Sequence, residues 1–170
     1  MRVINRRTTC IVTALSMAVA IVLGLAISTS VAHAETPFDV TSCYAGEIKV
    51  ISGSKELTVL GFEVSGIFRS NQENKALDNM TMYCIGVFRI TAGKGTSIAY
   101  CKGLDPDGDV IVQEHRRDGS NVTWEFLQGT GKYKGIKGGG TGKVVARGKP
   151  ITPGTTQGCS RVTGTFEVLE

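Results

Sequence analysis

The strongest constraint on the fold of this chain is an alternation of apolar and polar residues with a period of two. Between positions 60 and 68, the odd positions include Glu63 and Ser65, and the even positions are Leu60, Phe62, Val64, Gly66 and Phe68. The same period recurs at 80–90 and at 162–168. Successive side chains of a strand point to opposite faces, so the pattern predicts half-buried β-strands. In the segment 80–90 both sets contain apolar residues, which indicates a strand covered on both faces.

Eight such segments are separated by turn signals rich in Gly, Asp and Ser. The predicted strands span residues 43–51, 57–69, 80–91, 96–104, 109–117, 121–127, 141–147 and 159–168. The polar residues 70–79 are expected to form a loop or one helical turn. Short strands at regular spacing, without intervening helices, predict an all-β fold, either a barrel or a sandwich. Glycines inside the strands suggest the bends of a barrel. We expect a single antiparallel domain.

Residues 1–34 have the layout of a secretory signal peptide, which leaves 35–170 as the folded domain. Three arginines precede an uncharged apolar stretch at 10–27, and the segment ends in Ala32-His33-Ala34, a small-residue cleavage pattern. The apolar stretch is also long enough for an uncleaved membrane anchor. The small-residue exit and the lack of a basic flank favour cleavage, so we expect a secreted or periplasmic protein with no stable membrane anchor after cleavage.

The signal segment accounts for most of the net charge of +4, because it holds 3 of the 19 basic residues and none of the 15 acidic ones. The domain itself therefore carries a net charge of +1. A nucleic-acid-binding face needs clustered basic residues. The nearest approach is a set of four lysines, Lys132, Lys134, Lys137 and Lys143, for which a solvated loop is the simpler interpretation. Nucleic acid is therefore not an expected partner.

Four cysteines belong to the domain, because Cys10 lies in the signal segment: Cys43, Cys84, Cys101 and Cys159. An even number in an exported protein predicts two disulfides, for which three connectivities exist. Strand parity, the rule that odd and even positions of a strand point to opposite faces, favours two pairs. These are Cys43–Cys159 on the outer faces of the first and last strands, and Cys84–Cys101 across one hairpin. With a loop at 92–95, Cys84 would lie opposite Gly103 and diagonal to Cys101. Zinc is the rival interpretation, although no CxxC spacing exists and only His115 could assist.

Residues 129–142 contain 7 of the 22 glycines of the chain. They do not fit a phosphate-binding loop, because Val144 follows Lys143 where Ser or Thr is required. They do not fit a dinucleotide-binding motif either, because no helical pattern follows. We interpret the stretch as a glycine-rich barrel crossing in which Tyr133 points inward as an anchor.

The motif Gly-Thr-Gly-Lys-Tyr-x-Gly-x-x-Gly-x-Gly at 129–140, with a closing Gly-Thr-Phe-Glu-Val strand at 164–168, resembles the allene oxide cyclase and dirigent superfamily. The resemblance implies a calycin-like, eight-stranded antiparallel barrel. Members include cyclases of oxidised fatty acids and non-catalytic guides of radical coupling, so it also implies no cofactor and no metal. The chain departs from the motif at Gln128 and in its cysteines. The shared motif is structural, and no catalytic residue carries over.

His115, the sole histidine of the domain, is the default candidate for acid–base chemistry, with Glu114 beside it. Parity places these two side chains on opposite faces of their strand. A histidine beside Arg116 and Arg117 at a strand end is more typical of a solvated surface. The nucleophile motif Gly-x-Ser-x-Gly is absent. The acidic segment 105–109 lacks the spacing of an EF-hand and predicts a turn in preference to a calcium site.

Four aromatic residues are candidates to line a ligand cavity: Tyr83, Tyr100, Trp124 and Tyr133. An eight-stranded barrel is either filled by side chains or holds one small ligand, and a filled barrel is the simpler expectation. The first functional hypothesis is non-catalytic binding of a small apolar or aromatic ligand, or a structural role. The second is a cofactor-independent cyclase or isomerase that confines a hydrophobic substrate. A third is polyanion or surface binding through the lysines at 132–143.

Overall fold

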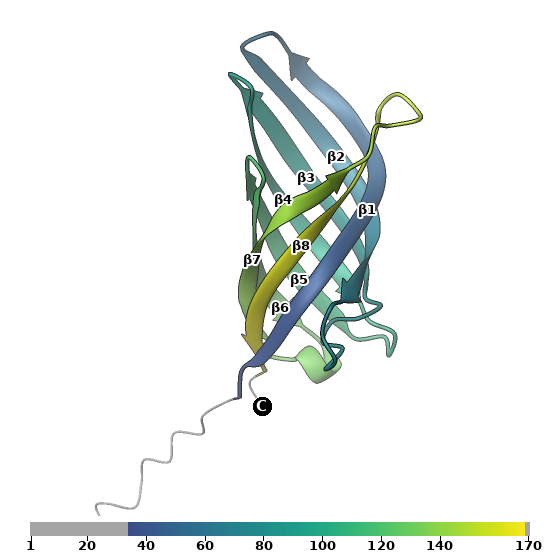
Figure 1. Ribbon diagram of the computed structural model, residues 1–170, viewed down its shortest axis with the longest axis vertical. Coiled ribbons are helices and arrows are strands. Elements are labelled where there is room, and N and C mark those ends of the chain that lie inside the picture. Colours follow the sequence, from purple (N-terminus) through teal and green to yellow (C-terminus); the bar gives the residue numbers. More distant parts are fainter. Residues whose placement is uncertain (1–33, 169–170) are drawn as a thin grey trace, which may run out of the picture. The chain divides into compact units, whose positions relative to one another are not determined.

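A computed structural model describes residues 34–168 and shows them as one closed β-barrel (Figure 1). Eight antiparallel strands follow one another around the barrel in sequence order, and β1 pairs with β8 to close it. The elements are β1 (Thr36–Gly53), β2 (Leu57–Ser70), β3 (Thr81–Thr91), β4 (Lys94–Leu104), β5 (Val110–Asp118), β6 (Asn121–Gly129), the 3-10 helix η1 (Gly131–Tyr133), β7 (Lys137–Arg147) and β8 (Thr155–Glu167). The predicted all-β fold and eight-stranded antiparallel barrel are confirmed.

The predicted signal peptide lies outside the described residues, apart from Ala34. Within 34–168, no helix combines the length and the hydrophobicity that a bilayer-spanning helix requires.

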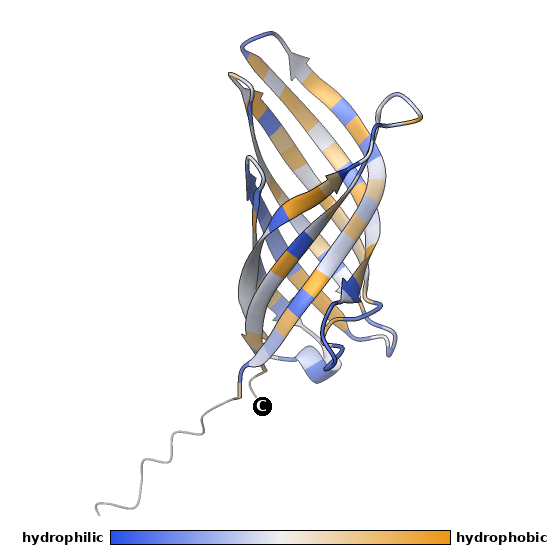
Figure 2. Cartoon of the chain, viewed as in Figure 1, coloured by the Kyte–Doolittle hydropathy of each residue, from blue (hydrophilic) through white to orange (hydrophobic). Residues whose placement is uncertain are grey.

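Hydrophobic and hydrophilic residues alternate along several strands (Figure 2), and the burial of the side chains assigns the two sets to the inner and outer faces of the barrel. On β3, Met82 and Cys84 are buried inside, whereas Tyr83 and Ile85 are exposed on the outer surface. The expectation that β3 is covered on both faces is wrong for the described part of the chain, because Ile85 is 56% exposed and Val87 is 44% exposed. Apolar character on both faces of this strand therefore does not reveal which face is the inner one.

One end of the barrel is filled by aromatic side chains. The ring of Phe38 lies with its centroid 6.3 Å from that of Trp124, 5.7 Å from Phe126 and 6.4 Å from Phe166. Tyr133 of η1 is buried, with its ring centroid 6.3 Å from that of Phe166. The predicted inward anchor at Tyr133 is therefore confirmed. Because η1 lies at this end of the barrel (Figure 1), it closes that end.

The loop after β2 closes the same end. Three of its residues, Lys75, Leu77 and Asn79, have φ angles of 53°, 59° and 58°, which interrupt regular structure. Leu77 is buried and adds an apolar side chain to the core. The backbone N–H of Ser70 donates to Oδ1 of Asp78 at 2.8 Å, which ties the loop to β2. The predicted loop at 70–79 is thus present as a series of turns.

Three strands begin four or more residues earlier than predicted: β1 at Thr36, β7 at Lys137 and β8 at Thr155. The start of β7 was hidden by its glycines, which lack the side chains that produce a period of two. At Gly140 the missing side chain makes room for a neighbour, since a Cβ there would lie 2.8 Å from Cζ of Phe38.

Both predicted disulfides are present. Cys43 of β1 and Cys159 of β8 lie directly opposite each other, with their Cα atoms 4.1 Å apart, and their bond crosses the seam where the barrel closes. Nearby, Nε of Arg161 donates to Oδ1 of Asp39 at 2.9 Å and adds an ion pair between the same two strands. The hydrogen bond from Arg161 lowers the pKa of Asp39.

Cys84 and Cys101 are bonded across the β3–β4 hairpin. The predicted register of this hairpin is wrong, because Cys84 lies opposite Cys101 instead of Gly103. The loop consists of Ala92 and Gly93 alone, with φ angles of 49° and 78°, the left-handed conformation of a two-residue hairpin turn. Two disulfides are typical of proteins that fold in an oxidising compartment.

Candidate functional site

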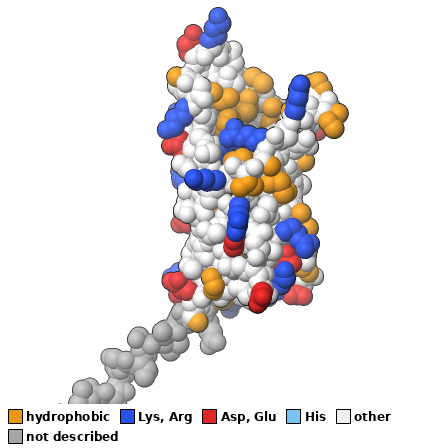
Figure 3. All heavy atoms as spheres, viewed as in Figure 1, with side chains coloured by type: hydrophobic (Ala, Val, Ile, Leu, Met, Phe, Trp, Pro, Cys, Tyr) orange, Lys and Arg blue, Asp and Glu red, His pale blue; other side chains and the backbone are white. Residues whose placement is uncertain are grey.

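The barrel interior is hollow toward the end that carries the β1–β2 and β3–β4 hairpins. A cavity of about 220 Å³ lies there. Apolar side chains make up most of its wall, and it is lined by Ser42, Tyr44, Ile48, Leu60, Phe62, Val64, Met82, Cys84, Phe88, Ser97, Ala99, His115, Arg116, Arg117, Val122, Trp124, Val144, Thr156 and Ser160. Figure 3 shows hydrophobic side chains exposed in the upper part of the molecule, beside Lys and Arg side chains. The barrel is therefore filled in one part only, contrary to the simpler expectation.

The cavity exists because β4 presents small side chains to the interior. The inner face of this strand consists of Gly95, Ser97, Ala99, Cys101 and Gly103. Neighbours fill the space at its two ends, since a Cβ on Gly95 would lie 2.5 Å from Cζ of Phe88 and one on Gly103 would lie 2.6 Å from Sδ of Met80. Between them, Ser97 and Ala99 face open space.

Three stacked rings mark the boundary between the cavity and the filled end. Trp124 stacks with both His115 and Phe68, with ring centroids 4.7 Å and 4.9 Å away and interplanar angles of 15° and 24°. Among residues 34–168, Nε1 of Trp124 and Nε2 of His115 are buried without hydrogen-bond partners, as are both amide atoms of Gln113. Buried polar atoms normally have partners, so these atoms are exceptions in the barrel interior.

His115 is directed into the barrel, so the interpretation of a solvated residue is wrong. The reason is strand parity, because His115 shares the inner face of β5 with Gln113, which is fully buried. Burial lowers the pKa of His115 from 6.5 to about 3. The imidazole is therefore neutral at ordinary pH, with one nitrogen that donates and one that accepts hydrogen bonds. Such a group can orient a ligand.

Arg117, the next inward residue of β5, lies at the mouth of the cavity. Its Cζ is 5.0 Å from the ring centroid of Phe88, and its Nε donates to the carbonyl of Gly119 at 2.7 Å. Burial lowers the pKa of Arg117, and the positive charge of Arg147 lowers it further. These contacts hold a half-buried guanidinium in a fixed place.

Glu114 faces the outer surface, so it does not share a site with His115. Nε of Arg116 donates to Oε1 of Glu114 at 2.5 Å. Tyr100 lies opposite Glu114 on β4, and its hydrogen bond is the main cause that lowers the pKa of Glu114, with Arg116 also contributing. The predicted pair of Glu114 and His115 is therefore split between the two faces of β5.

Only one of the four predicted aromatic residues, Trp124, lines the cavity. Tyr83 and Tyr100 are 42% and 54% exposed on the outer face of the barrel, and Tyr133 belongs to the filled end. The expected cavity positions of these three tyrosines are wrong. Tyr83 and Tyr100 occupy strand positions that point outward, and Tyr133 of η1 packs in the core at the filled end. Tyr44 of β1 is the tyrosine that does line the cavity.

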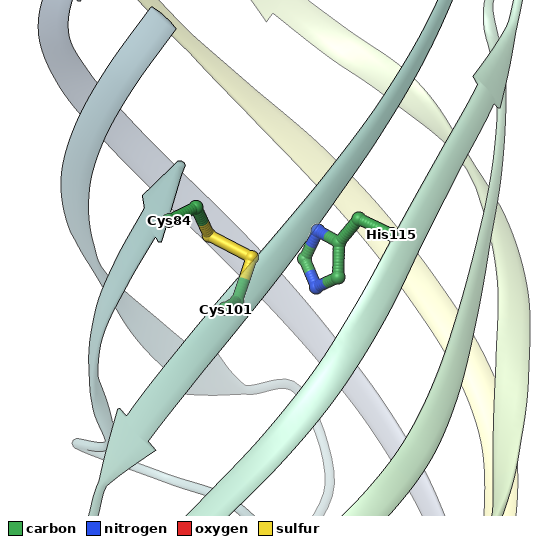
Figure 4. A group of neighbouring side chains, drawn as sticks. All are labelled: Cys84, Cys101 and His115. Carbon is green, nitrogen blue, oxygen red and sulfur yellow. A yellow bond between two sulfur atoms is a disulfide. The ribbon is translucent and has the colours of Figure 1, made fainter. Parts of the chain in front are cut away.

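Within the described part of the chain, the one cluster of metal-ligating residue types is formed by Cys84, Cys101 and His115 (Figure 4). Their ligand atoms lie within 4.8 Å of one another. The two sulfur atoms are bonded to each other, and a metal requires the thiolate form. This residue set in its disulfide form therefore does not fit the rival zinc site.

The acidic turn at 105–109 is held by a lysine of the chain itself. Nζ of Lys132 pairs with the carboxylates of Asp105 and Asp107, and the backbone N–H of Lys132 donates to Oδ2 of Asp109 at 3.1 Å. Burial tends to raise the pKa of Asp105, but Lys132 and the backbone amides of Asp109 and Asp107 lower it overall. The ammonium group of Lys132 thus neutralises carboxylates of the turn, which agrees with the predicted structural turn.

Sequence reasoning missed Tyr44, Ser97 and Arg117 as cavity residues. Parity placed Arg117 on the same face as His115, which was the available signal for Arg117. The missing information was which face of β5 is the inner one. For Ser97, no local signal exists, because a small residue in a strand does not show whether the space beside it is filled.

The fold and the cavity define the class of this protein: a single antiparallel β-barrel with one filled end and one hollow end. Comparisons with protein-family models and with curated protein sequences give no match. Similar solved structures include the pterocarpan synthase dirigent protein GePTS1, with 11% identity, a TM-score of 0.49 and coverage of 81% of this chain and 93% of that chain. They also include the pterocarpan synthase dirigent protein PsPTS1, with 12% identity, a TM-score of 0.48 and coverage of 81% and 97%. Each likeness concerns the overall fold alone.

Proposed function

We propose that this protein binds a small apolar or aromatic molecule in its cavity without converting it chemically. One observation carries the proposal: the barrel encloses a mostly apolar cavity whose wall includes a few polar side chains, among them Ser97, His115 and Arg117. Apolar concave surfaces with a few polar groups are the usual form of ligand sites. A purely structural barrel would be more stable with this space filled, because cavities lower stability.

The size of the cavity supports a small ligand. Its volume of about 220 Å³ is less than the roughly 300–1,000 Å³ of sites for drug-sized molecules. A cavity of about 220 Å³ suits a molecule with one ring or two fused rings. Phe62, Phe88 and Trp124 in the wall supply aromatic surface for such rings.

A cofactor-independent cyclase or isomerase is the alternative use of the same cavity. General acid–base catalysis near neutral pH is most effective with a group whose pKa is near that pH. Burial lowers the pKa of His115 to about 3, and among residues 34–168 no Asp or Glu lines the cavity. Binding is therefore supported better than catalysis.

We further propose that the barrel is exported after cleavage of residues 1–34. The support is the signal-like pattern of the sequence together with two disulfides, which persist mainly in oxidising compartments.

The binding proposal can be tested with the only tryptophan of the chain. Because Trp124 borders the cavity, its fluorescence should be quenched saturably by 2-naphthol, a small two-ring probe that accepts energy from tryptophan. The protein used is the oxidised domain, residues 35–170. Failure of 2-naphthol to quench in a saturable way would contradict a ligand-sized cavity beside Trp124.

A matched pair of variants locates the binding site. Ser97→Phe places a ring in the cavity. Thr96→Phe, one residue earlier on β4, places the same ring on the outer face of the barrel. We expect Ser97→Phe to weaken 2-naphthol binding by about tenfold or more and Thr96→Phe to change it by less than about twofold. Thermal unfolding confirms that both variants are folded. Equal binding by both variants would place the site outside the cavity.

A further inference from the structure

The mouth of the cavity carries positive charge that nothing in the described chain neutralises. Arg117 forms no ion pair within 34–168, and the cavity wall contains no Asp or Glu there. Arg147 of β7 lies opposite Gly158 of β8, where a Cβ would lie 3.1 Å from Oη of the cavity-lining Tyr44, and the charge of Arg147 lowers the pKa of Arg117. The third arginine, Arg116, is already paired with Glu114. Within 34–168, neither Arg117 nor Arg147 forms an ion pair with an acidic residue.

This arrangement favours the binding of an anion. Partial burial removes water from the guanidinium of Arg117, and the like charge of Arg147 adds repulsion. Only Nε of Arg117 has a hydrogen-bond partner within 34–168, the carbonyl of Gly119, so the two Nη groups are available. A guanidinium with free Nη groups matches the geometry of a carboxylate, with which it forms paired hydrogen bonds.

The position of Arg117 relative to the stacked rings sets the length of the ligand. His115 and Arg117 are two residues apart on β5, which corresponds to about 7 Å along a strand. A ring beside His115 and Trp124 would therefore lie one short linker away from a carboxylate at Arg117. This separation suits an aromatic acid with its charge at one end.

We propose that the ligand is a small aromatic carboxylate. Its ring lies in the apolar cavity near Trp124, and its carboxylate binds Arg117 and Arg147 at the mouth. The proposal rests on the proposed binding function and adds the chemical class of the ligand. It also explains why the cavity has an apolar wall and a cationic mouth at once.

Pairs of probes that differ only in charge test this assignment. Isothermal titration calorimetry would compare phenylacetate with phenylacetamide and 2-naphthoate with 2-naphthamide, on the oxidised domain 35–170. We expect the carboxylate of at least one pair to bind about tenfold or more tightly than its amide, because hydrogen bonds to charged groups are stronger. Equal affinities within both pairs would overturn the carboxylate assignment but leave the binding function intact. Absence of binding by all four probes, together with no quenching by 2-naphthol, would contradict both.

Variants connect the charge preference to the mouth. Arg117→Gln and Arg147→Gln should each reduce the preference for the carboxylate to within about threefold of the amide. Arg89→Gln is the matched control, since it removes one positive charge from the outer face of β3 and should leave the preference unchanged. An equal loss of preference in all three variants would indicate a general electrostatic effect and would overturn the assignment of the mouth as the anion site.

Discussion

His115 and Trp124 stack with their ring centroids 4.7 Å apart, and burial of the imidazole lowers the pKa of His115 to about 3. In the unfolded chain the same group titrates near 6.5. Between these two values the unfolded chain binds a proton that the folded barrel does not bind. The contribution of His115 to stability is therefore fully present above pH 6.5 and is lost as the pH falls toward 3.

This titration predicts a measurable pH dependence of the free energy of unfolding. Between about pH 6 and about pH 4.5, His115 should remove up to about 1.4 kcal/mol of stability per pH unit. His115→Gln should show a shallower slope in urea unfolding over the same range. The carboxyl groups of Asp39 and Asp105 have lowered pKa values and lose their contribution only at lower pH. Identical slopes for the two proteins, or an NMR titration of His115 near 6.5, would contradict the buried position.

Gly140 of β7 lies where the barrel has little room for a side chain. A Cβ at this position would lie 2.5 Å from the carbonyl oxygen of Thr163 and 2.8 Å from Cζ of Phe38. Gly140→Ala should therefore lower the free energy of unfolding by about 1–3 kcal/mol. Gly61→Ala is the control, since its Cβ would meet only Cδ1 of Ile51 at 3.9 Å, and its effect should be within about 0.5 kcal/mol. Equal effects in chemical denaturation would show that β7 does not pack closely against Phe38.

At the scale of strands, the closing pair of β1 and β8 depends on one disulfide and one ion pair. Cys43 and Cys159 are separated by 116 residues, so their bond restricts the unfolded chain strongly. The ion pair of Asp39 and Arg161 contributes less, because the arginine side chain is 57% exposed.

Removal of the disulfide and removal of the ion pair between β1 and β8 should therefore lower the free energy of unfolding by different amounts. The double variant Cys43→Ala with Cys159→Ala should lower the free energy of unfolding by about 4–5 kcal/mol, following the chain-entropy argument. Asp39→Asn, which removes the ion pair, should cost about 1 kcal/mol or less. Both are measured by equilibrium denaturation under oxidising conditions. A double variant as stable as the native domain would contradict the role of the disulfide in closing the barrel.

Strands and disulfides were predictable because their signals are local or follow from parity. The period of two identifies a strand from a few neighbouring residues, and parity placed Cys43 and Cys159 on the outer faces of strands that meet at closure. The β3–β4 register was not predictable in the same way, because it depends on whether Ala92 adopts a positive φ. The start of β7 was missed since glycines carry no hydrophobic pattern.

At the scale of the whole molecule, the resemblance of 129–140 and the number of strands predicted the barrel, but not the division into a filled and a hollow end. Whether an interior is filled depends on the combined volume of side chains from several strands at one level. Ser97 and Ala99 leave space there, whereas Phe88 and Met80 fill the space at either end of the same strand. The outward position of Tyr83 was unpredictable for a related reason, since β3 is apolar on both faces.

Whether the ligand site lies inside the barrel is measured by the indole N–H resonance of Trp124 during titration of the oxidised domain with 2-naphthol. The chain has one tryptophan, so the resonance is unambiguous in a two-dimensional proton–nitrogen NMR spectrum. The cavity predicts that this resonance shifts saturably, while the backbone amides of Tyr83 and Ile85 on the exposed outer face of β3 do not. An unchanged indole resonance together with shifts at Tyr83 and Ile85 would show that apolar molecules bind the outer surface, and would contradict a binding site inside the barrel.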